Sequence, residues 1–366
     1  MLVKPEHFQR TGSFKIRGAY NRTWVLAREH PGAVAVAASA GNHAQGVALA
    51  ASLCGLASTI FMPANASLPK VEATRSYGAR VELHGETVSE AIEAARQFVA
   101  AHDGTYYVPP FDDPWVIAGQ GTVGLELAKE ATDVEVVMVP CGGGGLLAGV
   151  AAGLRAGGST ARVVGVEAAG AAPMVAALSA GSPVELGHVE TMADGIAVGS
   201  VSDLTLEHAR RLVDEVVTVS EEAISQAVLL LLERCKWVVE PAGAVGLAAL
   251  LAGHARGGGP VAVVLSGGNV DPLLLTRLIE HGLTAAGRYF MVRVVLADKP
   301  GALATLTGML GQLGLNLVTV EHRRSGAPVG VNEAEVVLTL ETRDPMHRDR
   351  IVPALQERGF RAEAYR

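Results

Sequence analysis

Apolar residues in the first three quarters of the chain form short continuous runs, and the segments between these runs carry apolar residues three or four positions apart. Continuous runs predict buried parallel strands, here at residues 33–39, 134–140 and 261–268. The intervening pattern predicts helices, such as residues 42–55 and 89–104, each of which ends at a glycine. This alternation predicts an α/β fold with one or two mostly parallel sheets covered by helices.

The pattern changes near residue 287. From there to the end of the chain the order is strand, helix, strand, strand, helix, strand, which is the ferredoxin-like arrangement. We therefore expect two domains, residues 1–287 and 288–366, with a smaller subdomain of the first at about residues 33–112.

Composition narrows the class of protein. Among 366 residues, 49% are hydrophobic and 18% charged, so the chain can bury a large core. A formal net charge of -7 argues against a nucleic-acid partner. The longest apolar runs stop well short of the ~20 residues that span a bilayer, which argues against a membrane protein. Cys54, Cys141 and Cys235 lack metal-ligand spacing, and we interpret them as reduced thiols of a cytoplasmic protein.

Four consecutive glycines, Gly142–Gly145, lie between an apolar strand and a helix. Exposed backbone N–H groups at such a turn bind phosphate, although glycine tracts also serve as flexible linkers. The same stretch supports a rival function. Gly143, Gly145 and Ala148 match the dinucleotide-binding pattern, and Glu167 follows at the distance of a ribose-binding acid.

Lys15 lies in "TGSFKIRGA", among small residues, glycine and hydroxyls. A surface lysine needs no such surroundings, whereas an amine that must lose its proton to react is favoured by desolvation. We therefore interpret Lys15 as a reactive amine.

The segment "SAGN" ends a strand and begins a helix, so its backbone N–H groups suit a substrate carboxylate. The residues of this candidate site are Ser39, Ala40, Gly41 and Asn42. Asn42 could instead cap the helix, and His43 is interpreted as a helix residue rather than a general base.

Ser266 in "LSGGN" and Glu240 in "VEPAGA" are further candidates, and a helix N-cap is the alternative for each. Ser266 follows a buried strand, at the sheet edge where open α/β folds bind ligands. An amine, a phosphate cradle, a hydroxyl and a carboxylate pocket together describe a site for pyridoxal phosphate.

These motifs, in this order over residues 4–271, resemble the threonine dehydratase family of fold-type II pyridoxal phosphate enzymes. The segment "DKPGALATLTGMLGQLGLNL" resembles an ACT domain, a module that binds amino acids and regulates metabolic enzymes. The resemblance implies a catalytic region of two open parallel-sheet subdomains followed by an ACT domain.

For the cofactor, the resemblance implies that Lys15 bonds covalently to the aldehyde, that Phe14 lies against the ring and that Asn42 binds its phenolic oxygen. It implies that the phosphate is held by Gly142, Gly143, Gly144, Gly145 and Leu146.

It also implies that Ser266 faces the pyridine nitrogen, that Gly195 lines the pocket and that Glu240 lies near the ring. Relatives with a divalent cation use a glutamate at Glu167, a carbonyl at Ala171 and an aspartate where this chain has Pro173. We therefore expect no divalent metal, and at most a monovalent cation at Glu167 and Ala171.

The implied reaction is elimination of water from L-threonine, giving 2-oxobutanoate and ammonia. L-serine is an alternative substrate, and Ala40 argues against racemisation because racemases carry a serine there. An inactive amino-acid sensor is the alternative from another class, since the chain begins closer to its lysine motif than family members do. ACT domains usually pair across subunits, so we expect a homodimer or homotetramer.

Overall fold

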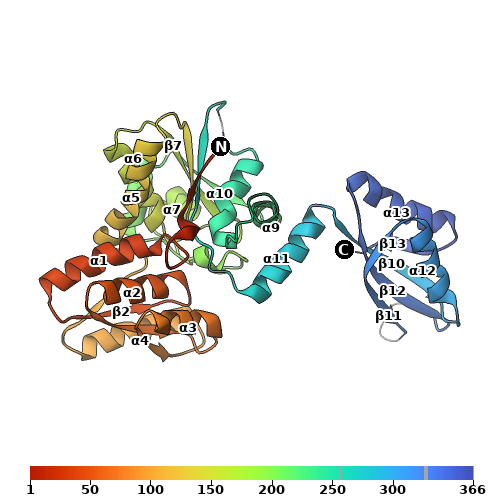
Figure 1. Cartoon of the computed structure of the whole chain (residues 1–366), viewed down its shortest axis with the longest axis horizontal. Coiled ribbons are helices and arrows are strands. Elements are labelled where there is room, and N and C mark those ends of the chain that lie inside the picture. The colour runs from red at the N-terminus through yellow and green to blue at the C-terminus, as the bar shows by residue number, and fades with distance from the viewer. Residues whose placement is uncertain (256, 325–328, 366) are drawn as a thin grey trace. The chain divides into compact units, whose positions relative to one another are not determined.

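The computed structural model describes residues 1–255, 257–324 and 329–365 (Figure 1). They form two compact units, Met1–Leu275 and Thr276–Arg366. Helix α11 (Pro272–Ala285) runs across the division between the units, and the domain boundary at residue 287 stays a prediction. Within the described ranges, no helix is long and apolar enough to cross a membrane.

The larger sheet of the first unit has five parallel strands. In their order across the sheet they are β1 (Leu2–Pro5), β9 (Val261–Leu265), β6 (Val136–Pro140), β7 (Arg162–Ala168) and β8 (Glu215–Val219). The four residues of β1 pair with β9 at the sheet edge, where Leu2 lies opposite Ala262. The first residues of the chain therefore form an edge strand of this sheet.

The smaller sheet of the first unit has four parallel strands. Across the sheet they are β4 (Arg80–Leu83), β3 (Ala57–Met62), β2 (Val34–Ala38) and β5 (Thr105–Tyr107). The helices that follow its strands are α2 (Asn42–Leu53), α3 (Leu68–Ser76) and α4 (Val88–Ala101). The expected pair of open parallel sheets is confirmed.

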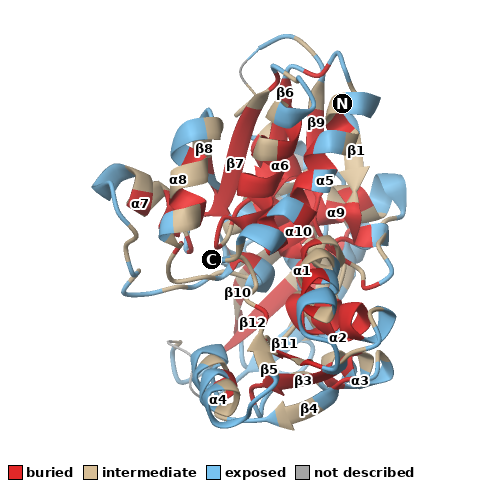
Figure 2. Cartoon of the chain, turned by 90° about the vertical axis from the view of Figure 1, so that its left-hand side faces the viewer, coloured by how far each residue is buried: buried red, intermediate tan, exposed pale blue. Residues whose placement is uncertain are grey.

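Helices cover both faces of the larger sheet, because successive side chains of each strand point to opposite faces. Val136 and Met138 of β6 pack in the cluster that contains α9 and α10, whereas Val137 and Val139 pack with α5 and α6. Figure 2 shows β6, β7 and β9 buried over most of their length. The remaining helices of the unit are α1 (Lys15–Glu29), α5 (Pro114–Glu130), α6 (Gly145–Ala156), α7 (Pro173–Ala180), α8 (Asp203–Leu212), α9 (Glu221–Leu230) and α10 (Pro241–Leu251).

The second unit contains the expected βαββαβ fold. Its elements are β10 (Tyr289–Ala297), α12 (Ala302–Gln312), β11 (Asn316–Arg323), β12 (Glu333–Glu341), α13 (Pro345–Glu357) and β13 (Arg361–Ala364). The four strands form an antiparallel sheet in the order β11-β12-β10-β13. Alternate residues of the central strands, such as Val294 and Leu338, pack with Leu306 and Leu355 of the two helices. This unit therefore has its own core.

Candidate active site

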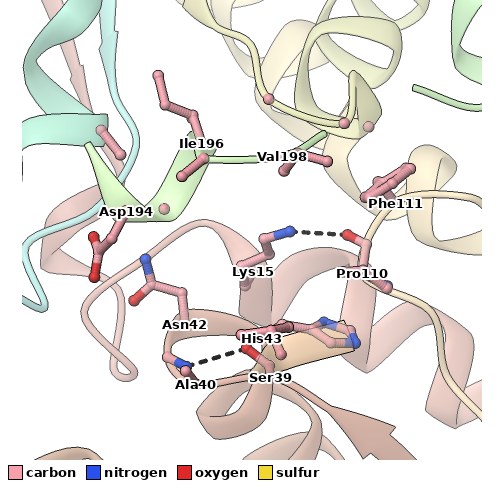
Figure 3. A pocket seen from close by; sticks show the side chains of 18 of the residues that line it. Lys15, Ser39, Ala40, Asn42, His43, Pro110, Phe111, Asp194, Ile196 and Val198 are labelled. Carbon is pink, nitrogen blue, oxygen red and sulfur yellow. Dashed lines mark hydrogen bonds between the residues drawn. The ribbon is translucent and has the colours of Figure 1, made fainter. Parts of the chain in front are cut away.

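A cavity of about 500 Å³ opens at the carboxyl ends of strands from both sheets of the first unit. Residues after β2, β6 and β9 line it, as open α/β folds predict for a ligand site. Figure 3 shows Lys15 and Asn42 pointing into this space, with Asp194, Ile196 and Val198 on the opposite wall. The predicted residues in its wall are Phe14, Lys15, Ser39, Ala40, Gly41, Asn42, Gly142, Gly143, Gly144, Gly145, Leu146, Gly195, Glu240 and Ser266.

Lys15 is the first residue of α1, and its side chain is partly exposed to the cavity. Its Nζ donates a hydrogen bond to the Pro110 carbonyl at 2.9 Å and lies 5.3 Å from the centre of the Phe14 ring (Figure 3). Desolvation lowers the pKa of Lys15 to about 8, against the opposing charge of Glu240. A substantial fraction of the amine is therefore neutral near physiological pH.

The glycine run forms a tight turn into α6. Gly144 has a φ of +88°, which favours glycine, and a Cβ on Gly143 would lie 2.4 Å from Phe111 Cδ1. In the described part of the chain, the amides of Gly142, Gly143 and Gly144 donate to no protein acceptor. These N–H groups, together with the positive end of the α6 dipole, make an anion site. A flexible linker is the wrong interpretation of this stretch.

Both polar atoms of the Asn42 side-chain amide are hydrogen-bonded. Its Nδ2 donates to Glu240 Oε1 at 2.6 Å, and its Oδ1 accepts from Asn269 Nδ2 at 2.7 Å. Asn269 also donates to the Thr11 carbonyl at 2.6 Å. Gly41, not Asn42, is the N-cap of α2, so the capping alternative for Asn42 is wrong. Sequence reasoning missed Asn269, although it ends the "LSGGN" motif.

Glu240 is buried beside the Asn42 amide. It is the N-cap residue of α10 by position, but its side chain makes no capping hydrogen bond. Desolvation, and then the charge of Asp194, raise the pKa of Glu240 to about 7 despite the bond from Asn42. A Cβ on Gly195 would lie 2.9 Å from Ala242 Cβ, so this wall of the cavity has no room for a side chain.

Ser266 directly follows β9 and is buried in the cavity wall. Its hydroxyl makes only a long contact, 3.5 Å, with the Ala242 carbonyl. The next helix, α11, begins at Pro272, so Ser266 is not a helix N-cap. Its hydroxyl is free to bind a ligand atom.

The loop after β2 also presents unpaired amides. Ser39 Oγ accepts from the Gly41 amide at 3.1 Å, and within the described residues the amides of Ala40 and Asn42 have no acceptor. His43 Nε2 bonds to the Val108 carbonyl at 2.8 Å. Desolvation, and then the charge of Lys15, lower the pKa of His43 to about 3. His43 is therefore neutral and held by the fold, which does not suit a general base.

Glu167 lies outside this cavity wall. Its carboxylate accepts hydrogen bonds from the amides of Met174 at 2.8 Å and Val175 at 3.0 Å, in the first turn of α7. Desolvation raises the pKa of Glu167 to about 7. Both oxygens are therefore engaged by α7, which argues against a ribose-binding role. The described residues hold no cluster of three metal-ligating side chains, and the cation at Glu167 and Ala171 stays a prediction.

Comparison with known families decides between a pyridoxal phosphate site and a dinucleotide site. A model described as pyridoxal-phosphate dependent enzyme matches residues 1–267. The chain belongs to this family. An ACT domain model matches residues 290–360, within the second unit.

Several relatives within the pyridoxal-phosphate dependent enzymes match nearly the whole chain. An L-threonine ammonia-lyase of Thermotoga maritima is 46% identical over 98% of this chain and 90% of its own length. One of Geobacter sulfurreducens is 45% identical over 98% of this chain and 90% of its own. Among solved structures, threonine deaminase isoform 2 of Solanum lycopersicum has a TM-score of 0.72 and 39% identity, covering 76% of this chain and 82% of that one.

The residues present fit pyridoxal phosphate, the cofactor of this family. The aldehyde of the cofactor needs an amine, and Lys15 Nζ can supply it. The phosphate needs several N–H donors, and the backbone N–H groups of the glycine turn are unpaired. The pyridine nitrogen and phenolic oxygen of the cofactor need polar partners, and Ser266 Oγ and Asn42 Nδ2 lie in the same cavity wall. The side chain of Phe14 supplies an apolar surface beside Lys15.

Proposed function

We propose that this protein deaminates L-threonine, releasing 2-oxobutanoate and ammonia. The observation that carries the proposal is the placing of Lys15 Nζ, with a pKa of about 8, in one cavity with the unpaired amides of Gly142–Gly144. The relatives named L-threonine ammonia-lyase and threonine deaminase support the choice of substrate.

When bound, pyridoxal phosphate supplies an electron-accepting ring that stabilises negative charge on the substrate's α-carbon. Lys15 Nζ, neutral in part near pH 7, accepts the α-proton. The glycine amides hold the phosphate, and the Ser39–Asn42 loop binds the substrate carboxylate through its N–H groups. Ser266 would offer the pyridine nitrogen a neutral hydroxyl rather than a carboxylate, which would favour loss of the β-hydroxyl over other reactions.

The substitution Lys15→Ala tests this function. We expect it to reduce 2-oxobutanoate formation by at least 1,000-fold, because both the covalent anchor and the base are lost. The wild-type protein should be yellow and bleach with borohydride, while the variant should keep its far-ultraviolet circular dichroism. Turnover above a tenth of the wild-type rate would contradict the assignment. A colourless, inactive wild-type protein that binds amino acids would instead support the sensor alternative.

We further propose that an amino acid binds the ACT region and regulates turnover. The match of residues 290–360 to the ACT model and the separate core of this unit support this proposal. The expected homodimer or homotetramer and the cytoplasmic location stay predictions. Light scattering of the purified chain measures the oligomeric state.

A further inference from the structure

Lys70 and Asp194 form an ion pair in the cavity wall. Lys70 belongs to α3, beside the smaller sheet, and Asp194 begins a 3-10 turn (Asp194–Ile196) of the larger subdomain. Lys70 Nζ lies 2.9 Å from Asp194 Oδ2, and the two side chains are 19% and 53% exposed. The pair therefore joins the two subdomains beside the space that Lys15 enters.

This pair differs from an ordinary surface ion pair, which contributes little and is fully solvated. The Lys70 side chain is partly buried, and among the described residues Asp194 Oδ2 is the only hydrogen-bond acceptor of its ammonium. An ammonium has three N–H donors, so two of them remain for another partner. A partly buried cation with spare donors, at the edge of a cavity, favours an anionic ligand.

The direction of the ammonium indicates where that anion binds. A Cβ built on Gly41 would lie 3.8 Å from Lys70 Nζ, so the ammonium faces this loop. Gly41 belongs to the loop in which the amides of Ala40 and Asn42 are unpaired. The ammonium therefore borders the candidate carboxylate site.

The charges of the pair also reach the interior of the cavity. Asp194 raises the pKa of the buried Glu240, and Lys70 lowers it. Glu240 in turn accepts the hydrogen bond from Asn42. Both members of the pair are therefore within electrostatic range of the groups that surround a bound amino acid.

We propose that Lys70 is a specificity-determining residue that binds the α-carboxylate of the substrate. Without substrate its ammonium is paired with Asp194, and when an amino acid binds, its spare donors turn to the carboxylate held by the Ser39–Asn42 amides. This inference rests on the proposed function, since it deepens the same site. The backbone N–H groups of the loop are neutral donors, whereas Lys70 carries a positive charge. Lys70 therefore makes binding depend on the negative charge of a free carboxylate.

The test replaces Lys70 by Met in the cofactor-loaded full chain. We expect the KM for L-threonine to rise at least 10-fold while kcat changes less than about threefold, because the ammonium binds substrate and transition state alike. Lys70→Arg should recover most of the affinity. Lys129→Met, which removes an exposed lysine of α5 outside the cavity, should leave KM unchanged.

A second measurement separates charge recognition from a structural role. L-threonine amide lacks the negative charge, so the wild-type protein should bind it at least 10-fold more weakly than L-threonine. Lys70→Met should reduce that ratio, while the backbone amides of the Ser39–Asn42 loop retain part of it. Lys70→Gln, which can still bond to Asp194, provides the same comparison if the Met variant folds poorly. An unchanged ratio, or a fall in kcat at constant KM, would overturn the inference.

The two proposals fail differently. A wild-type protein that does not deaminate L-threonine would contradict the proposed function itself. An active wild-type protein whose KM and amide ratio are unaffected by Lys70→Met would contradict only the role of Lys70.

Discussion

At the scale of single residues, the protonation state of Lys15 predicts how the rate of cofactor binding depends on pH. Desolvation lowers its pKa from 10.5 to about 8, so the fraction of neutral amine rises with pH and is complete only above about pH 9. In cofactor-free protein, we expect the rate of pyridoxal phosphate capture to rise through pH 7 and 8 and then to level off. Stopped-flow absorbance between pH 6.5 and 10 measures this rate.

The same experiment contains its own control. A lysine with an unshifted pKa would give a capture rate that keeps rising to pH 10, and this outcome would show that Lys15 is not desolvated. Lys15→Ala should show no covalent capture at any pH, although phosphate binding at the glycine turn would persist.

Site residues that lie in a recognisable local motif could be found from the sequence. The role of a residue that depends on partners far away in the chain could not. Lys15, the glycine turn and Ser266 carry local signals, and the structure places all of them in one cavity wall. Asn42, by contrast, meets Glu240 and Asn269, which lie 198 and 227 positions away. No local pattern contains such a contact, so the capping alternative for Asn42 stayed open until the fold was known.

At the scale of elements, the contact between α5 and α6 positions the phosphate cradle, because α6 begins within the glycine turn. The two helices approach closely at glycines: a Cβ on Gly153 would lie 2.0 Å from the Gly121 carbonyl, and one on Gly124 would lie 2.2 Å from the Val150 carbonyl. No side chain fits at these points without moving one helix away from the other.

We therefore expect Gly153→Ala to destabilise the protein by about 1–3 kcal/mol, because overpacking outweighs the higher helix propensity of alanine. It should also weaken the binding of pyridoxal phosphate. Thermal unfolding and cofactor titration measure the two effects. Gly308→Ala on α12, where a Cβ meets nothing within 4 Å, is the matched control and should not lower the unfolding temperature. If Gly153→Ala and Gly308→Ala lowered the unfolding temperature equally, close packing of α5 against α6 would not explain the loss of stability.

The buried strands of the larger sheet were predictable because their apolar runs are continuous, as in β6 and β9. No element was predicted for the first 29 residues. Strand β1 has only four residues and depends on β9, its partner across the sheet. Up to Thr23, helix α1 buries only Gly18, Ala19 and that threonine, and larger apolar residues are buried only after it, which leaves a short hydrophobic pattern.

At the scale of the whole molecule, the chain combines a catalytic unit with a separately folded ACT unit, and α11 connects them. An effector can change turnover only if it binds two states of the protein with different affinity. The regulation that we propose therefore requires the ACT unit, because the effector site is assigned to that unit.

We expect branched-chain amino acids to shift the threonine saturation curve of the full chain, and we expect this shift to vanish when the chain is truncated after Gly287. The first unit has its own sheets and core, so the truncated protein should still turn over L-threonine. Initial rates with and without isoleucine or valine, measured on both proteins, decide the matter. A full chain that does not respond, or a truncated chain that still does, would remove the ACT region from regulation by these amino acids, because a response carried by the ACT unit must appear in the full chain and disappear with that unit.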